Sequence, residues 1–91
     1  MVYYIAIVHK DADSAYGVSF PDIPGCFSAT DDEEWLVENA VEALSLWAED
    51  STLPAPSSIE TVRTRQDVAQ ELIAGAFLLA VPAPSRVAKA A

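Results

Sequence analysis

The sequence is short of cysteine, glycine and long apolar runs, and each shortage excludes a class of protein. Its single cysteine, Cys26, permits no internal disulfide, and without a Cys/His cluster there is no structural zinc site. The three glycines are isolated, so no glycine-rich phosphate-binding loop is present. No apolar run approaches the roughly 20 residues that span a bilayer, and the N-terminus lacks the basic start and apolar run of a signal peptide. We therefore expect a soluble, cytoplasmic protein without a metal, a cofactor or a membrane partner.

Positive charge is also scarce, and the excess of negative charge is uneven along the chain. The 91 residues carry 14 Asp and Glu against 5 Lys and Arg, for a net charge of −9. Residues 1–52 hold eleven of the acids and one base, Lys10, whereas residues 53–91 hold three acids and four bases. The acidic first half repels phosphate backbones, which argues against nucleic-acid binding, and it attracts a basic protein. Taken alone, the charge is explained more simply by a need for solubility.

Alternating apolar residues predict a sheet within one small α+β domain. The expected strands are Val2–Val8, Tyr16–Phe20, Gly25–Ala29 and Phe77–Val81. Tyr16, Val18 and Phe20 share one face of the second strand, because side chains alternate along a strand. Phe77–Val81 is apolar throughout, which predicts a central strand buried on both faces. Before the third strand, the two prolines of Pro21–Gly25 predict a rigid loop.

The main helix is predicted to run from Thr30 to about Ala48. Thr30 and Glu33 fit a capping box, and the acids of the first turn suit the positive end of the helix dipole. The apolar stripe consists of Leu36, Ala40, Leu44 and Trp47, and the opposite side carries Glu38, Glu42, Ser45 and Glu49. Residues 59–74 form a weaker helical region, either one helix or a turn and a helix. The predicted order is β-β-β-α-(α)-β, an antiparallel sheet with one main amphipathic helix on one face.

The acidic residues do not form a recognisable catalytic pattern. Most lie consecutively at the start of the predicted helix or on its solvent side, where capping and solubility explain them better than a metal-dependent nuclease site does. His9, the only histidine, ends the first strand with no nucleophile tied to it by a motif, which favours an ordinary surface residue over a general base. Cys26 has apolar and acidic neighbours, which favour a packing role over a reactive thiolate. We expect no enzyme activity.

The segment Tyr16–Trp47 resembles the HicB-like antitoxin family. The shared pattern is an aromatic residue, a Gly or Ala, and Val-Ser-Phe-Pro-Asp-Ile-Pro-Gly-Cys, then Glu-Asn-Ala, and then Ala-Leu before a tryptophan. The matching residues are Tyr16, Val18, Ser19, Phe20, Pro21, Asp22, Ile23, Pro24, Gly25, Cys26, Glu38, Asn39, Ala40, Ala43, Leu44 and Trp47. The Leu53–Ser58 connection is similar to the proline-serine segment of the family, so the resemblance extends over about residues 1–82.

The resemblance implies a fold and a partner. The fold is a partial RNase H-like sheet over residues 1–82, without the nuclease carboxylates. The partner is a HicA-type toxin, a small basic protein that cleaves mRNA and is occluded by its antitoxin, and family members commonly form dimers or larger assemblies. Many carry a C-terminal DNA-binding domain. Residues 83–91 are expected to be a flexible tail or the start of a linker to such a domain, which would be absent here, so DNA would be bound only outside this chain.

Charge and resemblance together predict an antitoxin domain that neutralises a toxin. The residues expected to contact the toxin are Asp22, Asp31, Asp32, Glu34, Trp35, Glu38 and Glu42. Exposed ion pairs contribute little affinity each, so the binding energy is expected to rest on a few apolar anchors, with Trp35 as the candidate. Two alternatives stay open, which are an orphan interaction or oligomerisation module without a toxin and a small nuclease-like enzyme.

Overall fold

The computed structural model describes residues 2–84, which form a four-stranded antiparallel sheet with helices on both faces. The elements are β1 (Tyr3–Lys10), β2 (Tyr16–Ser19), β3 (Phe27–Thr30), the 3-10 turn η1 (Glu33–Trp35), α1 (Leu36–Asp50), α2 (Ile59–Arg63), α3 (Gln66–Ile73) and β4 (Phe77–Pro82). The strand order is β3-β2-β1-β4, and every neighbouring pair is antiparallel. This arrangement confirms the α+β class and the predicted order of elements.

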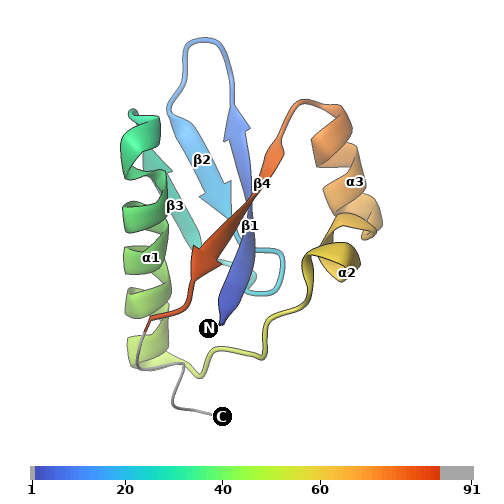
Figure 1. Ribbon diagram of the computed structural model, residues 1–91. Coiled ribbons are helices and arrows are strands. Elements are labelled where there is room, and N and C mark those ends of the chain that lie inside the picture. The colour runs from blue at the N-terminus through green and yellow to red at the C-terminus, as the bar shows by residue number, and fades with distance from the viewer. Residues whose placement is uncertain (1, 85–91) are drawn as a thin grey trace.

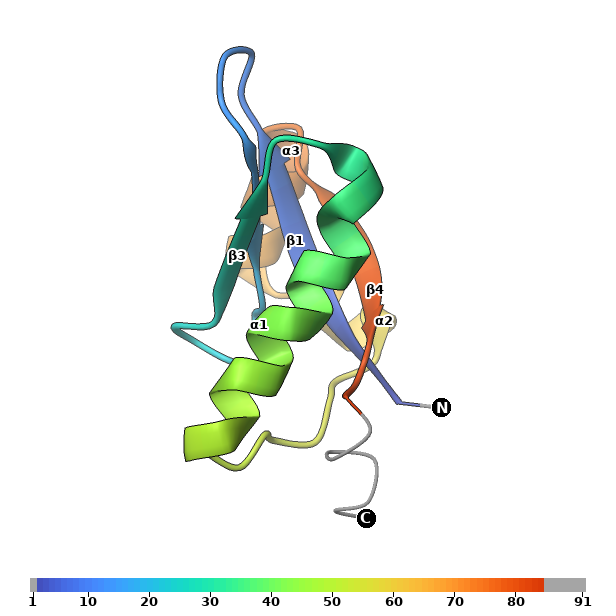
Figure 2. The ribbon, with the colours of Figure 1, turned by 90° about the vertical axis from the view of Figure 1, so that its left-hand side faces the viewer.

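The sheet has α1 on one face and α2 and α3 on the other (Figures 1 and 2), and it separates two hydrophobic clusters. The larger lies between α1 and the sheet, and Tyr4, Ala6 and Val8 of β1 belong to it. The smaller lies under α2 and α3, and it takes Ile5 and Ile7 from the other side of β1. Figure 2 shows α1 in front of the sheet with α2 and α3 behind it. The strand buried on both faces is therefore β1.

The prediction that Phe77–Val81 is a central strand is wrong. Among the described residues, the corresponding strand, β4, pairs only with β1 and lies at one edge of the sheet. Phe77 is 43% exposed, and Val81 is the one fully buried residue of the strand. A continuous apolar run indicates a buried strand but does not fix its place in the sheet, which depends on pairing between distant segments.

The predicted capping box at Thr30 is also wrong, because the helix begins later. Thr30 ends β3, and its hydroxyl accepts a hydrogen bond from the amide of Asp32 at 3.2 Å. Asp32 caps the η1 turn by accepting from the amide of Glu34 at 3.0 Å, and α1 starts only at Leu36. The acids that precede α1 thus form a separate turn, and side-chain capping takes place at Asp32, two residues later than predicted.

Residues 59–74 form two short helices joined by a turn, and not one continuous helix. Ser58 caps α2 by accepting from the amide of Thr61 at 3.2 Å, and α3 follows after a turn. Past β4, the amide of Ala83 donates to the carbonyl of Val2 at 2.8 Å and prolongs the pairing with the first strand. Most of the predicted tail, residues 85–91, lies outside the described residues.

Candidate partner-binding surface

The outer face of α1 is acidic. Leu36, Ala40 and Leu44 are buried against the sheet, whereas the glutamates on the opposite side of the helix are exposed. These are Glu38, Glu42 and Glu49, at spacings that align them along one side of an α-helix. The helix contains no basic residue, and within residues 2–84 none of these glutamates forms a salt bridge. Two residues expected to contact a toxin, Glu38 and Glu42, therefore share one surface.

Four further predicted contact residues lie at the N-terminal end of α1. All four are exposed. Asp31 and Asp32 directly precede the η1 turn, and Glu34 and Trp35 belong to it. Asp32 is used locally as the cap of this turn. Trp35, the candidate apolar anchor, is 45% exposed. The acidic surface thus extends from η1 along the length of α1.

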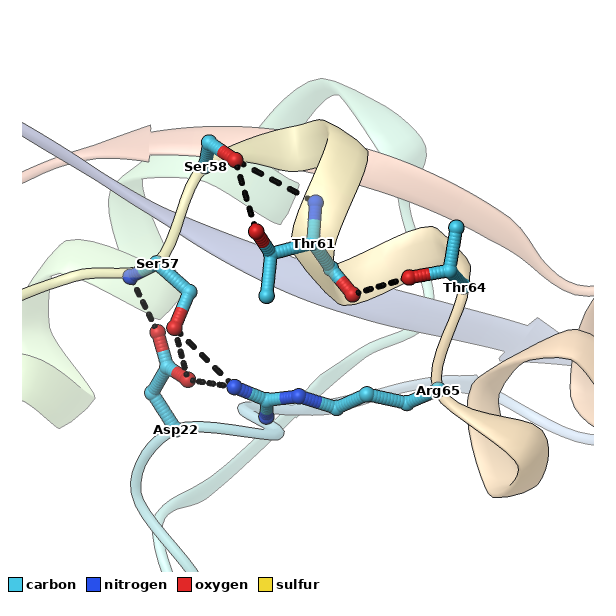
Figure 3. A network of polar contacts seen from close by, with 6 residues as sticks. All are labelled: Asp22, Ser57, Ser58, Thr61, Thr64 and Arg65. Atoms are coloured by element: carbon cyan, nitrogen blue, oxygen red, sulfur yellow. Dashed lines mark hydrogen bonds and ion pairs between the residues drawn. The ribbon is translucent and has the colours of Figure 1, made fainter.

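The remaining predicted contact residue, Asp22, lies in the loop before β3, at the opposite end of that strand from η1 (Figure 1). Its side chain is only 8% exposed. One carboxylate oxygen accepts from the amide of Ser57 at 2.7 Å, and the other accepts from the Ser57 hydroxyl at 2.9 Å and from Arg65 Nη2 at 2.7 Å. Figure 3 shows these contacts, which join the loop to the connection before α2 and to the turn before α3. Asp22 therefore links these segments inside the domain, and its contacts with Ser57 and Arg65 are called the Asp22 clasp.

The clasp also explains the ionisation of Asp22. Burial by itself raises the pKa of this carboxyl group, but hydrogen bonds from the Ser57 amide, Arg65 and the Ser57 hydroxyl, with the charge of Arg65, hold the pKa below its usual value. Nearby, the Tyr4 hydroxyl donates to the carbonyl of Pro54. Its burial and the charge of Asp22 raise the pKa of Tyr4. Both groups tie the segment between α1 and α2 to the end of the sheet.

A groove of about 460 Å³ lies between α1 and the edge strand β3. Its lining includes Gly25, Ser28, Asn39, Glu42, Leu46 and Asp50. Leu46 is 59% exposed, and Phe27 on the adjoining strand is 68% exposed. Neither residue was predicted from the sequence as a partner contact. For Leu46, its position outside the predicted apolar stripe could have indicated exposure. The groove thus combines the carboxylates of α1 with the exposed side chain of Leu46.

Two residues of the recognised motif shape this groove. Gly25 has φ +92°, and a Cβ at this position would lie 3.3 Å from Cη2 of Trp47, so glycine permits both the turn and the close packing of the indole. Asn39 donates from its side-chain amide to the carbonyl of Ala29 at 3.3 Å and so ties α1 to β3. The motif thus builds the junction between the helix and the edge strand.

The groups considered for catalysis lie apart from this groove or are buried. His9 Nδ1 lies 2.9 Å from Glu71 Oε2, on the face of the sheet opposite α1. The Cys26 thiol is buried, and burial raises its pKa, which disfavours a reactive thiolate. Within residues 2–84 no group of three His, Cys, Asp or Glu side chains is placed to hold a metal ion. None of the helices in this part of the chain has the length and apolarity to cross a membrane.

Comparison with known proteins identifies the family. The curated relative that matches is an uncharacterised 14.9 kDa protein from the rep-hol intergenic region of Haemophilus phage HP1, which is 42% identical over 65 residues. The match covers 66% of this chain and 47% of that protein, so the chain spans about half the length of this relative.

Solved structures share the fold. The crystal structure of the Burkholderia pseudomallei antitoxin HicB is 28% identical with a TM-score of 0.69, over 90% of this chain and 63% of that chain. A chain of the HicA3 and HicB3 toxin–antitoxin complex is 26% identical with a TM-score of 0.69, over 91% of this chain and 99% of that chain. The family model described as the HicB-like antitoxin of bacterial toxin–antitoxin systems matches residues 4–83. The chain therefore belongs to the HicB-like antitoxin family.

Proposed function

We propose that this chain neutralises a HicA-type toxin by binding it through the acidic surface of η1 and α1. The observation that carries the proposal is the row of exposed glutamates on α1: the helix has no base, and none of these glutamates forms a salt bridge within residues 2–84. Such a surface attracts a basic protein, and it competes with RNA phosphates for the same Lys and Arg side chains. The relationship to a chain of a toxin–antitoxin complex supports a toxin as the basic partner.

The mechanism is steric and electrostatic, and the chain acts in the cytoplasm without a catalytic step of its own. Long-range attraction brings the basic toxin to α1, and the bound chain then covers the surface that holds RNA. Asp22 is left out of this interface, because its carboxylate is nearly buried and both of its oxygens are already hydrogen bonded. We further propose that any operator binding by a longer protein resides outside residues 4–83, because the acidic surface repels DNA.

Charge reversal tests the proposal. The variant carries Glu34→Lys, Glu38→Lys and Glu42→Lys, all at exposed positions of the proposed interface. The matched control carries Asp13→Lys, Glu60→Lys and Asp67→Lys, which are exposed acids elsewhere on the surface. Both triple variants change the net charge by the same amount, so the total charge is held equal between them. The comparison therefore isolates the position of the charge.

The measurement is the association rate with a HicA-type toxin encoded beside the gene of this chain, at low and at high salt. We expect the α1 variant to associate at least about tenfold more slowly at low salt, with a smaller difference at high salt, because ions screen exposed charges. The control should stay close to the wild type. Equal rates for the two variants would reject the acidic face as the interface, and failure of the wild type to bind the toxin would favour an orphan interaction module.

A further inference from the structure

The sheet has two open edges, and they differ in their surroundings. Within residues 2–84, β3 pairs only with β2, and β4 pairs only with β1. An unpaired edge presents backbone amides and carbonyls to another chain, and proteins usually protect such an edge with lysine, proline or a covering segment. The sequence of β3, Phe-Ser-Ala-Thr, contains neither lysine nor proline. This edge is therefore able to accept an additional strand.

The edge at β3 is flanked by acids and by apolar side chains. On the α1 side, Glu42 and Asp50 line the groove beside the strand, and no Lys, Arg or His is among the groove residues. Phe27 lies on the other face of the sheet. It pairs with Ser19, and paired residues share a face of the sheet. Val18, next to Ser19, faces α1, so Ser19 and Phe27 face away from α1. The side chains of an added strand would alternate between the two faces of the sheet. Those on the α1 face would lie near the carboxylates, and those on the other face would lie near the exposed ring of Phe27.

We propose that an extended basic segment of the partner protein adds to the sheet as a fifth strand along β3. Its basic side chains lie in the groove near Glu42 and Asp50, and its alternate apolar side chains pack on Phe27. Backbone pairing uses the outward-facing groups of β3, which are the amide and carbonyl of Phe27 and the amide of Ala29, because Asn39 already bonds the carbonyl of Ala29. This inference rests on the proposed function and specifies how the toxin, or another basic partner, would be held.

A second copy of this chain fits the same edge poorly. Antiparallel pairing of two β3 strands would bring Glu42 and Asp50 of one copy close to the same residues of the other, in a chain whose net charge is −9. The edge at β4 lacks this obstacle, because Phe77–Pro82 has no charged residue and belongs to the nearly neutral second half of the chain. Charge thus favours a basic partner at β3.

Hydrogen exchange on the chain alone and in complex with the toxin tests the proposal. We expect exchange of the Phe27 and Ala29 amides to slow at least about tenfold in the complex, because strand pairing bonds backbone amides. The amides of β4 provide an internal control and should exchange at unchanged rates. If the free chain is already dimeric and the Phe27 and Ala29 amides are already protected in it, a second copy occupies the edge and the proposal is wrong.

A pair of lysine variants provides an independent readout. Phe27→Lys places a cation beside the edge that is proposed to receive a basic strand, and Ile73→Lys places one at a site on α3 that is 87% exposed. We expect Phe27→Lys to raise the dissociation constant for the toxin at least about tenfold and Ile73→Lys to leave it unchanged, with both variants folded by circular dichroism. Tight binding by Phe27→Lys, together with unslowed exchange of the Phe27 and Ala29 amides in the wild-type complex, would overturn strand addition and leave the proposed function standing. Absence of any binding by the wild type would overturn both.

Discussion

Replacing Asp22 by alanine should destabilise the domain far more than replacing an ordinary surface acid. The carboxylate joins three segments that are distant in the sequence, since Ser57 lies 35 residues away and Arg65 lies 43 residues away. Alanine removes both contacts to Ser57 and the ion pair with Arg65 together. The loop before β3 would then lose its polar link to the two short helices.

The size of the effect follows from the number of contacts and their exposure. Each of the two hydrogen bonds from Ser57 contributes about 1 kcal/mol, and a buried charged pair adds more. Arg65 is 33% exposed and can recover part of its hydration, so its share is discounted to about 1 kcal/mol. The sum is a loss of about 2–3 kcal/mol in the free energy of unfolding. For a domain of this size the melting temperature should fall by about 10–20 °C.

Thermal and urea unfolding followed by circular dichroism measure this change. Asp13→Ala is the matched control, because Asp13 is exposed and makes no side-chain hydrogen bond within the described part of the chain. The control should change the unfolding free energy by less than about 0.5 kcal/mol. Equal melting temperatures for the two variants would refute the role of Asp22 as a clasp.

Three further predictions concern the same junctions. Asp22→Asn should lower the free energy of unfolding at neutral pH, and the loss should become smaller as the pH falls below about 4. The reason is that folding lowers the pKa of Asp22, so the contribution of the carboxylate disappears as it becomes protonated. Unfolding curves from pH 7 to pH 2 check this. Gly25→Ala should cost about 1–2 kcal/mol, because φ is +92° and the new Cβ lies 3.3 Å from Trp47, and a smaller residue at position 47 should recover only the part of the loss that comes from crowding. The Cys26 thiol should react with a thiol reagent at neutral pH only when the domain opens, so its rate should rise sharply in urea, and fast reaction of the folded chain would contradict its burial.

Local patterns in the sequence predicted the elements better than their positions. The alternation of Tyr16, Val18 and Phe20 correctly indicated one buried face of β2, because strand periodicity is a property of neighbouring residues. The edge position of β4 and the late start of α1 at Leu36 were missed. The first depends on which distant strands pair, and the second on a turn that competes with the helix for the same capping side chains.

The same limit applies to the surface. The helical spacing of Glu38 and Glu42 was enough to place them together, since it is fixed by the geometry of one helix. The burial of Asp22 was not predictable, because it depends on Arg65, a residue from another part of the chain whose contact no local pattern encodes. Exposed Phe27 was likewise hidden, because an aromatic residue in a strand normally indicates core.

The measurement that bears most directly on the central claim is inhibition of the toxin by this chain. The purified chain is titrated at low salt into an RNA-cleavage reaction of a HicA-type toxin encoded beside its gene, and the α1 charge-reversal variant is titrated in parallel. Neutralisation through the acidic face predicts that the wild type abolishes cleavage near stoichiometric amounts and that the variant requires a large excess. Undiminished cleavage in the presence of excess folded wild-type chain would contradict the account.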